Sequence, residues 1–437
     1  MHSVYFTRRG VFALLLAMTL GPVAGVAQQL PIIFVHGNGD SAALWTTTLW
    51  RFESNGYDRS RLFAPNMRKP SSRNDDTVPM ENRSSTVEEA GQLADEVTRA
   101  LLLSGEKKVI LVGNSRGGNA IRNYIRNAGG AAHVAQAILC GTPNHGVTAA
   151  PGAPNAEFNG AGNFLNGLNK PNEVYPDVAF MTIRSDKNDK FAQPVLGFPS
   201  VGGFDGPELK GAKNVMIPGL DHRETAYHAL AFHAMYEFIT GKPPATLDIA
   251  REERPVLNGL VAGYVNGAPT NLPLVGATVA VFEVDPATGQ RKGDAVHTKT
   301  TNWDGMWGPF TATATAYYEF EFRAPGGPLF HIYRSPFPRS SNIVGLRAGP
   351  ATSAAGAPGS MVIISRPRGY LGVGRDTFLV DGKVPEGVGA GAPTNDSGQL
   401  RFPAGPPRAV EVVFNKETIT VQTWPAANGH IVIAEFH

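Results

Sequence analysis

Short apolar runs alternate with amphipathic stretches up to about residue 242. Five runs rich in aliphatic residues predict strands: 31–35, 108–113, 134–140, 180–184 and 214–218. Between the first two, five apolar residues recur at helical spacing and predict a crossover helix: Val87, Ala90, Leu93, Val97 and Leu101. Thr86 and Glu89 flank its start as a candidate capping box. The alternation predicts an α/β domain over 28–242, with a mainly parallel sheet covered by helices on both faces.

The pattern changes beyond residue 243. Helical periodicity disappears, Gly, Pro, Thr and Val become frequent, and four runs predict strands: 277–284, 317–322, 418–423 and 430–436. We expect an all-β sandwich or barrel over 250–347. A stretch rich in Gly, Ala and Pro at 348–359 separates it from a second β segment or domain over 360–437.

Residues 146–178 form a long stretch rich in Gly, Asn, Pro and Ala between two expected strands. Loops of this length are uncommon in compact domains unless they are functional or disordered. We therefore treat the stretch as a candidate lid or cap segment of the α/β domain.

The first 27 residues have the pattern of an export signal. Arg8 and Arg9 precede an apolar run at 11–20, and small residues at 25–27 offer a cleavage site. The order of residues 7–12 resembles a twin-arginine signal, with a plain Sec signal as the alternative. We expect an exported protein, periplasmic or secreted. We expect no transmembrane segment, because no apolar run reaches the ~20 residues that a span needs.

Charge and cysteine content narrow the possible classes of protein further. Without Arg8 and Arg9 the 39 basic residues fall to 37, equal to the 37 acidic residues, so the mature chain has no electrostatic footprint for nucleic acid. The single cysteine, Cys140, cannot form an internal disulfide. It lies in an apolar run, which predicts a small buried side chain rather than a catalytic thiol.

The sequence Gly113-Asn114-Ser115-Arg116-Gly117 carries the strongest chemical signal. It has the G-x-S-x-G pattern, follows an apolar strand and precedes a helical stretch at 119–126. In this context the glycines permit a tight strand-to-helix turn that presents the serine oxygen at the carboxyl edge of the sheet. Ser115 is therefore the candidate nucleophile.

A serine nucleophile needs a base, and His222 is the candidate. It lies just after the strand expected at 214–218, at the start of the last helical stretch of the catalytic domain. His228 and His233 lie within that stretch beside an apolar stripe, where a structural role is more common.

The base in turn needs a carboxylate to orient it. Asp186 and Asp189 both follow the strand expected at 180–184. We favour Asp189, because the residues from it to Pro194 have a pattern that anchors an acid loop, and we keep Asp186 as the alternative. Asp221 is adjacent to His222 in the sequence, so we do not expect its carboxylate to reach the other nitrogen of the imidazole.

Two backbone N–H groups are expected to stabilise the oxyanion of the reaction. One belongs to Arg116, the residue after the nucleophile, and the other to Asn38, in the loop 36–39 after the first strand. For His36 we expect an orienting hydrogen bond and not a catalytic role. No zinc, calcium or phosphate-binding pattern is present in the sequence, and this chemistry requires no metal or cofactor.

Four motifs together resemble those of bacterial and archaeal lipases of the α/β-hydrolase fold: 34–39, 113–118, 141–146 and 219–222. The resemblance covers residues 28–242, implies a serine esterase and supports His222 as the base. Arg116 departs from it, since these lipases often carry a hydrophobic residue such as methionine there, which leaves the acyl-pocket preference open.

The C-terminal half is similar to the β-domain of a subgroup of these lipases, in which it helps to bind long acyl chains. Residues 274–281 and 302–310 also look like transthyretin-like sandwiches. Five aromatic residues could form an apolar contact surface, although aromatic residues at strand spacing more often belong to a core: Trp303, Trp307, Phe330, Tyr333 and Phe337.

The expected function is hydrolysis of lipid or other water-insoluble acyl esters. A polyester depolymerase that uses the same triad is the alternative, and a non-catalytic cell-envelope binding protein is the remoter one.

Overall fold

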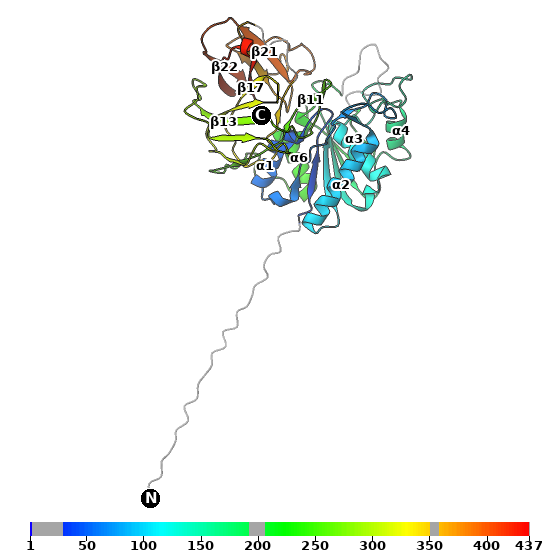
Figure 1. The fold of residues 1–437 in the computed structure, drawn as a ribbon. Coiled ribbons are helices and arrows are strands. Elements are labelled where there is room, and N and C mark those ends of the chain that lie inside the picture. The colour runs from blue at the N-terminus through cyan, green and yellow to red at the C-terminus, as the bar shows by residue number, and fades with distance from the viewer. Residues whose placement is uncertain (2–28, 192–205, 350–357, 437) are drawn as a thin grey trace.

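The computed structural model describes Met1 and residues 29–191, 206–349 and 358–436. The expected export signal, apart from Met1, lies outside the described residues, as does Pro194 of the acid-loop pattern. Figure 1 shows an N-terminal half with helices around a central sheet, beside a C-terminal half built of strands.

The central sheet has six parallel strands in the order β2-β1-β5-β6-β7-β8. Their bounds are β1 (Ile32–Val35), β2 (Leu62–Phe63), β5 (Val109–Asn114), β6 (Val134–Cys140), β7 (Ala179–Arg184) and β8 (Lys213–Met216). The five strands expected from the sequence are all present within two residues of their predicted ends. The expected fold class, a mainly parallel α/β sheet followed by a β-rich region, is confirmed.

Helices cover both faces of this sheet (Figure 1). They are α1 (Thr46–Ser54), α2 (Thr86–Ser104), α3 (Arg116–Asn127), α4 (Asn163–Asn169), α5 (Glu224–Tyr227) and α6 (Ala229–Thr240). In β1, Ile32 and Phe34 pack in the core that includes residues of α1 and α6, whereas Ile33 and Val35 pack in the core of α2 and α3. The period of two along a strand thus supplies apolar side chains to both layers.

The capping box of α2 lies one residue earlier than predicted. Ser85 Oγ accepts from the N–H of Glu88 at 3.1 Å, and Glu88 Oε2 accepts from the N–H of Ser85 at 2.6 Å. The predicted pair was wrong because Thr86 is already helical and bonds Asp76, while Glu89 is buried.

The two expected β segments share one seven-stranded sheet in the order β14-β13-β16-β17-β24-β19-β21. Its strands are β13 (Thr278–Val284), β14 (His297–Thr300), β16 (Tyr317–Arg323), β17 (Leu329–Arg334), β19 (Ser360–Ser365), β21 (Ser397–Phe402) and β24 (His430–Glu435). Because β17 pairs in parallel with β24, the stretch 348–359 divides the sequence but not the sheet.

A three-stranded sheet packs on one face of the large one as a sandwich. It contains β20 (Phe378–Val380), β22 (Ala409–Phe414) and β23 (Glu417–Gln422), and Val380, Val412 and Val421 meet Val362 and Val432 of the large sheet. The short strands are β3 (Ser71–Ser72), β4 (Arg83–Ser84), β9 (Val256–Leu257), β10 (Val261–Ala262), β11 (Tyr264–Val265), β12 (Ala268–Pro269), β15 (Phe310–Thr311) and β18 (Leu346–Arg347).

Four of the five aromatic residues considered for a contact surface are buried in the β-rich region: Trp307, Phe330, Tyr333 and Phe337. The prediction of an aromatic contact surface is therefore wrong. Among the five residues only Trp303 is exposed, at 84%. Cys140 is buried and free, and burial raises the pKa of its thiol above the ordinary value. Within the described part of the chain, no helix has both the length and the apolar character needed to cross a bilayer.

Candidate active site

Ser115 occupies a strained turn between β5 and α3. Its φ of 55° and ψ of −120° lie outside the regions that L-residues favour. Glycine is required on both sides of it: a Cβ on Gly113 would lie 2.6 Å from the carbonyl carbon of Gly117, and one on Gly117 would lie 2.3 Å from the oxygen of Val35. The strain is thus held by close backbone packing, as in a nucleophile elbow.

His222 and Asp189 lie together, as the sequence suggested for this pair. His222 Nδ1 is 2.9 Å from Asp189 Oδ1, and both side chains are buried. Because the carboxylate accepts the Nδ1 proton, Nε2 is left as the basic nitrogen. Nε2 has no hydrogen-bond partner among the described residues. Asn114 ties this pair to the nucleophile turn, since its Nδ2 donates to the carbonyl of His222 at 3.2 Å.

Asp186, the alternative acid, has a different place. Its Oδ1 accepts from the N–H and the side chain of Asn188, and its Oδ2 accepts from the N–H of Gly219 at 3.1 Å. It therefore shapes the loops beside the histidine, whereas Asp189 bonds the imidazole directly.

The structure places the other two histidines of this region, His228 and His233, at the start of α6 and within it. The expected last helix is interrupted, and His228 stands between α5 and α6, where its Nδ1 accepts from the N–H of Leu230. The prediction that His228 lies inside the helix was wrong, because its ring caps α6. His233 lies within α6.

The loop after β1 packs against the nucleophile turn. A Cβ on Gly37 would lie 3.1 Å from Ser115 Cβ, so the loop and the serine are in close contact. Asn38 is exposed, and its Oδ1 accepts from the N–H of Ser72 at 2.8 Å. Its backbone N–H stays the donor expected from the sequence. Arg116 is the first residue of α3, and the N–H at that position has no acceptor within its own helix.

His36 is buried beneath this loop and stays neutral. Burial lowers the pKa of its imidazole to about 4. Nδ1 donates to the carbonyl of Gly37 at 3.0 Å, and Nε2 accepts from the N–H of Met67 at 3.0 Å. It makes the orienting hydrogen bond that the sequence suggested.

The side chain of Arg116 is fully buried in a cluster of polar groups. Its Nε donates to both carboxylate oxygens of Glu157 at 3.0 and 2.9 Å, and its Nη1 donates to Glu89 at 3.2 Å and to Ser84 Oγ at 2.8 Å. Glu157 belongs to the candidate lid segment, so the residue after the nucleophile fastens that segment to the domain. Its role as a lid stays a prediction.

A cavity of about 420 Å³ lies between the loop after β1 and the β-rich region. Asn38 and Gly39 of that loop form part of its lining. Part of the remaining lining is apolar and comes from the β-rich region, with side chains such as Leu260, Phe330 and Ile431. Charged side chains such as Arg223, Arg347 and Arg368 also line it, and Ser115 and His222 are not among its lining residues.

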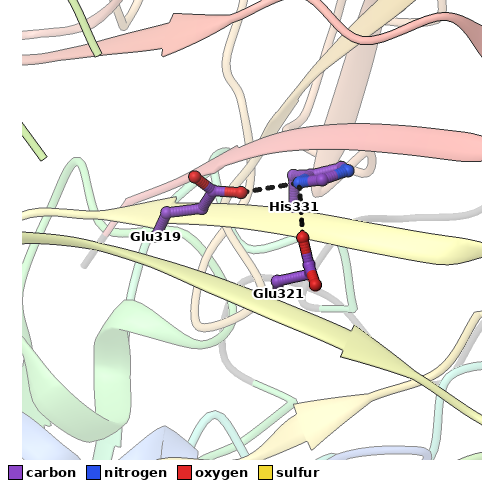
Figure 2. A group of neighbouring side chains, drawn as sticks. All are labelled: Glu319, Glu321 and His331. Carbon is purple, nitrogen blue, oxygen red and sulfur yellow. Dashed lines mark hydrogen bonds and ion pairs between the residues drawn. The ribbon is translucent and has the colours of Figure 1, made fainter. Parts of the chain in front are cut away.

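A second group of polar side chains lies in the β-rich region (Figure 2). His331 Nδ1 lies 2.6 Å from Glu319 Oε1 and 4.0 Å from Glu321 Oε2. Arg291 Nη2 contacts both carboxylates at 2.6 Å. Arg291 thus pairs with both carboxylates, and we read the group as an ion-pair network of the sheet.

Two family models match the chain. Residues 31–184 match palmitoyl protein thioesterase, and residues 258–350 match the lipase C-terminal domain. The first match covers the parallel sheet from β1 to β7 with the nucleophile turn, and the second covers the first part of the β-rich region. The chain has the α/β-hydrolase fold, followed by a β-rich region whose first part is similar to a lipase C-terminal domain. The family matches support a hydrolase that acts on esters.

Solved structures similar to this hydrolase include bacterial and fungal lipases. Lipase B from Aspergillus fumigatus is 17% identical with a TM-score of 0.37, over 50% of this chain and 54% of that one. The mature form of the Bacillus licheniformis lipase BlEst2 is 20% identical with a TM-score of 0.38, over 49% of this chain and 93% of that one. The chain thus spans about half the length of the fungal lipase.

Sequence reasoning missed the residues that support this site from a distance. Glu157 and, in the β-rich region, Asn271, Arg347 and Arg366 are separated from it by long stretches of chain. No local pattern marks them.

Proposed function

We propose that the protein hydrolyses carboxylic esters with water-insoluble acyl groups through an acyl-enzyme on Ser115. The observation that carries this proposal is the His222–Asp189 pair beside a strained serine turn, with Nε2 left free of hydrogen bonds to described residues. Nε2 takes the hydroxyl proton as the serine oxygen attacks the ester carbonyl carbon.

The N–H groups of Asn38 and Arg116 hold the negative oxygen of the tetrahedral intermediate. Collapse of the intermediate breaks the bond to the alcohol, which leaves with the proton from His222. Water then attacks the acyl-enzyme with the same base, and the released acid frees Ser115. The apolar lining of the cavity beside Asn38 supports an apolar acyl group as the substrate part that is bound.

Hydrolysis of p-nitrophenyl esters from C2 to C18 tests the proposal. We expect the protein to favour long chains and Ser115→Ala to lose at least ~10³-fold in turnover, since removal of a catalytic serine has such effects. Ser104→Ala, at the end of α2, is the matched control and should keep the parent rate. Equal rates of the parent and Ser115→Ala would mean that another group is the nucleophile.

The same site could act on a polyester, because the chemistry at the carbonyl is identical. Turnover of emulsified triglyceride compared with the weight loss of a polyester film separates the two substrates. Binding to cell-envelope material without turnover of any ester would favour the non-catalytic alternative. Export remains part of the proposal on the basis of residues 1–27 alone, and N-terminal sequencing of protein from the periplasm and medium tests it.

A further inference from the structure

A side chain of the β-rich region reaches under the loop that carries the candidate oxyanion donor. Asn271 is 4% exposed, and its Nδ2 donates to the carbonyls of Asp40 at 2.8 Å and Met67 at 2.9 Å. The same Nδ2 lies 3.3 Å from His36 Nε2. Its Oδ1 accepts from Arg347 Nη2 at 2.5 Å. One amide thus contacts the loop at Asp40 and His36 and the neighbouring segment at Met67.

The N–H of Met67 sets the tautomer of His36. It donates to Nε2, so a neutral ring carries its proton on Nδ1. The two N–H groups of Asn271 are taken by the carbonyls of Asp40 and Met67, so its amide only packs against Nε2. Nδ1 can then donate to the carbonyl of Gly37. In a planar trans peptide this carbonyl points opposite to the N–H of Asn38. A hydrogen bond that fixes the carbonyl therefore also fixes the direction of the candidate oxyanion donor.

Arg347 completes the support from the β-rich region. Its Nη1 donates to the carbonyl of Gly39 at 2.9 Å, next to the Asp40 carbonyl that Asn271 holds. The Asp40 carboxylate in turn pairs with Arg223, at 2.8 Å, and Arg223 directly follows His222. The loop of the oxyanion donor and the loop of the base are joined at this point.

We propose that Asn271 is a positioning residue: its amide N–H groups hold the carbonyls of Asp40 and Met67 and thereby aim the N–H of Asn38 at the developing oxyanion. Asp40 and Met67 transmit this support, because their own N–H groups bond the Gly37 carbonyl and His36 Nε2. The inference rests on the proposed function and deepens it, because it makes the β-rich region part of the machinery that builds the oxyanion site.

Asn271→Asp is the decisive variant. Aspartate keeps the size of the side chain and the oxygen that Arg347 contacts, but an ionised carboxylate has no N–H to donate. It cannot hold the carbonyls of Asp40 and Met67, so the two segments whose N–H groups bond the Gly37 carbonyl and His36 Nε2 should shift. Removal of one oxyanion donor commonly lowers kcat by ~10²–10³-fold, and for a misdirected donor we expect about tenfold or more.

The measurements separate positioning from mere attachment of the two regions. With p-nitrophenyl butyrate we expect kcat to fall about tenfold while KM stays within about threefold, because the loss concerns the transition state. The rate at which a fluorophosphonate labels Ser115 should fall by a similar factor, since its phosphoryl oxygen occupies the same site. Asn258→Asp is the matched control: Asn258 Oδ1 accepts hydrogen bonds from Gly259 and Gly308, both within the β-rich region, so kcat and labelling should match the parent.

Each outcome has one meaning. A parent that neither turns over esters nor labels at Ser115 defeats the proposed function itself. A folded Asn271→Asp protein with parental kcat and labelling, or with a raised KM alone, overturns the positioning role while the proposed function stands. Asn271→Ala, which adds no charge, repeats the test if the aspartate variant does not fold. Unfolding of both variants would assign Asn271 to domain attachment and also overturn the proposal.

Discussion

Replacing Glu157 by glutamine should make the stability of the protein less dependent on pH. Glu157 and Glu89 are buried with one guanidinium, that of Arg116, so the cluster carries one uncompensated negative charge when both acids are ionised. Burial raises the pKa of Glu157 from 4.5 to about 7, although the attraction of Arg116 opposes the shift. The folded protein therefore binds a proton at Glu157 more readily than the unfolded chain does.

The sign and size of the effect follow from this shift. A carboxyl whose pKa is raised by folding contributes stability that is fully present below its unfolded pKa and is lost as the pH rises through its folded pKa. Between 4.5 and about 7, at ~1.36 kcal/mol for each pKa unit, the parent loses about 3 kcal/mol from this group. Glutamine has no such titration, so the stability of Glu157→Gln relative to the parent should rise by up to about this amount from pH 5 to pH 8.

Urea unfolding followed by tryptophan fluorescence at pH 5, 6, 7 and 8 measures the difference. Glu88→Gln is the matched control, because the hydrogen bond from Ser85 and the charge of Arg73 lower the pKa of Glu88 despite its desolvation, and its titration falls below this pH range. Its stability relative to the parent should stay constant. A constant difference for Glu157→Gln as well would refute the reasoning, since the buried cluster would then be balanced without a proton.

Two further predictions concern the candidate site. Asp189→Asn should lower kcat by ~10⁴-fold because the amide no longer fixes the imidazole tautomer, whereas Asp186→Asn should keep most of the turnover; the reverse order would exchange their roles. Gly117→Ala should destabilise the protein by ~1–3 kcal/mol, because its Cβ would lie 2.3 Å from the backbone oxygen of Val35. Gly91→Ala in α2 meets nothing within 4 Å and should raise the melting temperature slightly; equal melting temperatures for both variants would show that the turn relaxes freely.

The β-rich region also holds the loop of the base. Arg366 donates to the buried carboxylates of Asp221 at 2.8 Å and Glu224 at 2.5 Å, on either side of His222. The N–H of Tyr370 adds a bond to Asp221 at 2.8 Å. Together with Asn271 under the other loop, these contacts explain physically how a region with no triad residue can set the geometry of the site.

Sequence by itself determined the elements whose signals are local. The strands of the central sheet, the turn around Ser115 and the place of His222 after a strand follow from apolar runs, glycine positions and chain order. Where neighbouring residues fit one pattern equally well, the sequence was less precise. Ser85 and Thr86 could both begin a capping box, and the extended backbone of Ser85 decided between them.

Tertiary structure alone decided the pairing of distant residues. Asp186 and Asp189 follow the same strand, and although a local pattern favoured Asp189, only the folded loop places it against the imidazole of His222. The strands of the two β segments join one sheet, and Asn271 reaches His36 across 235 positions of chain. Periodicity reports which face of an element is buried but carries no information on which distant side chain covers it, because that depends on how the chain packs as a whole.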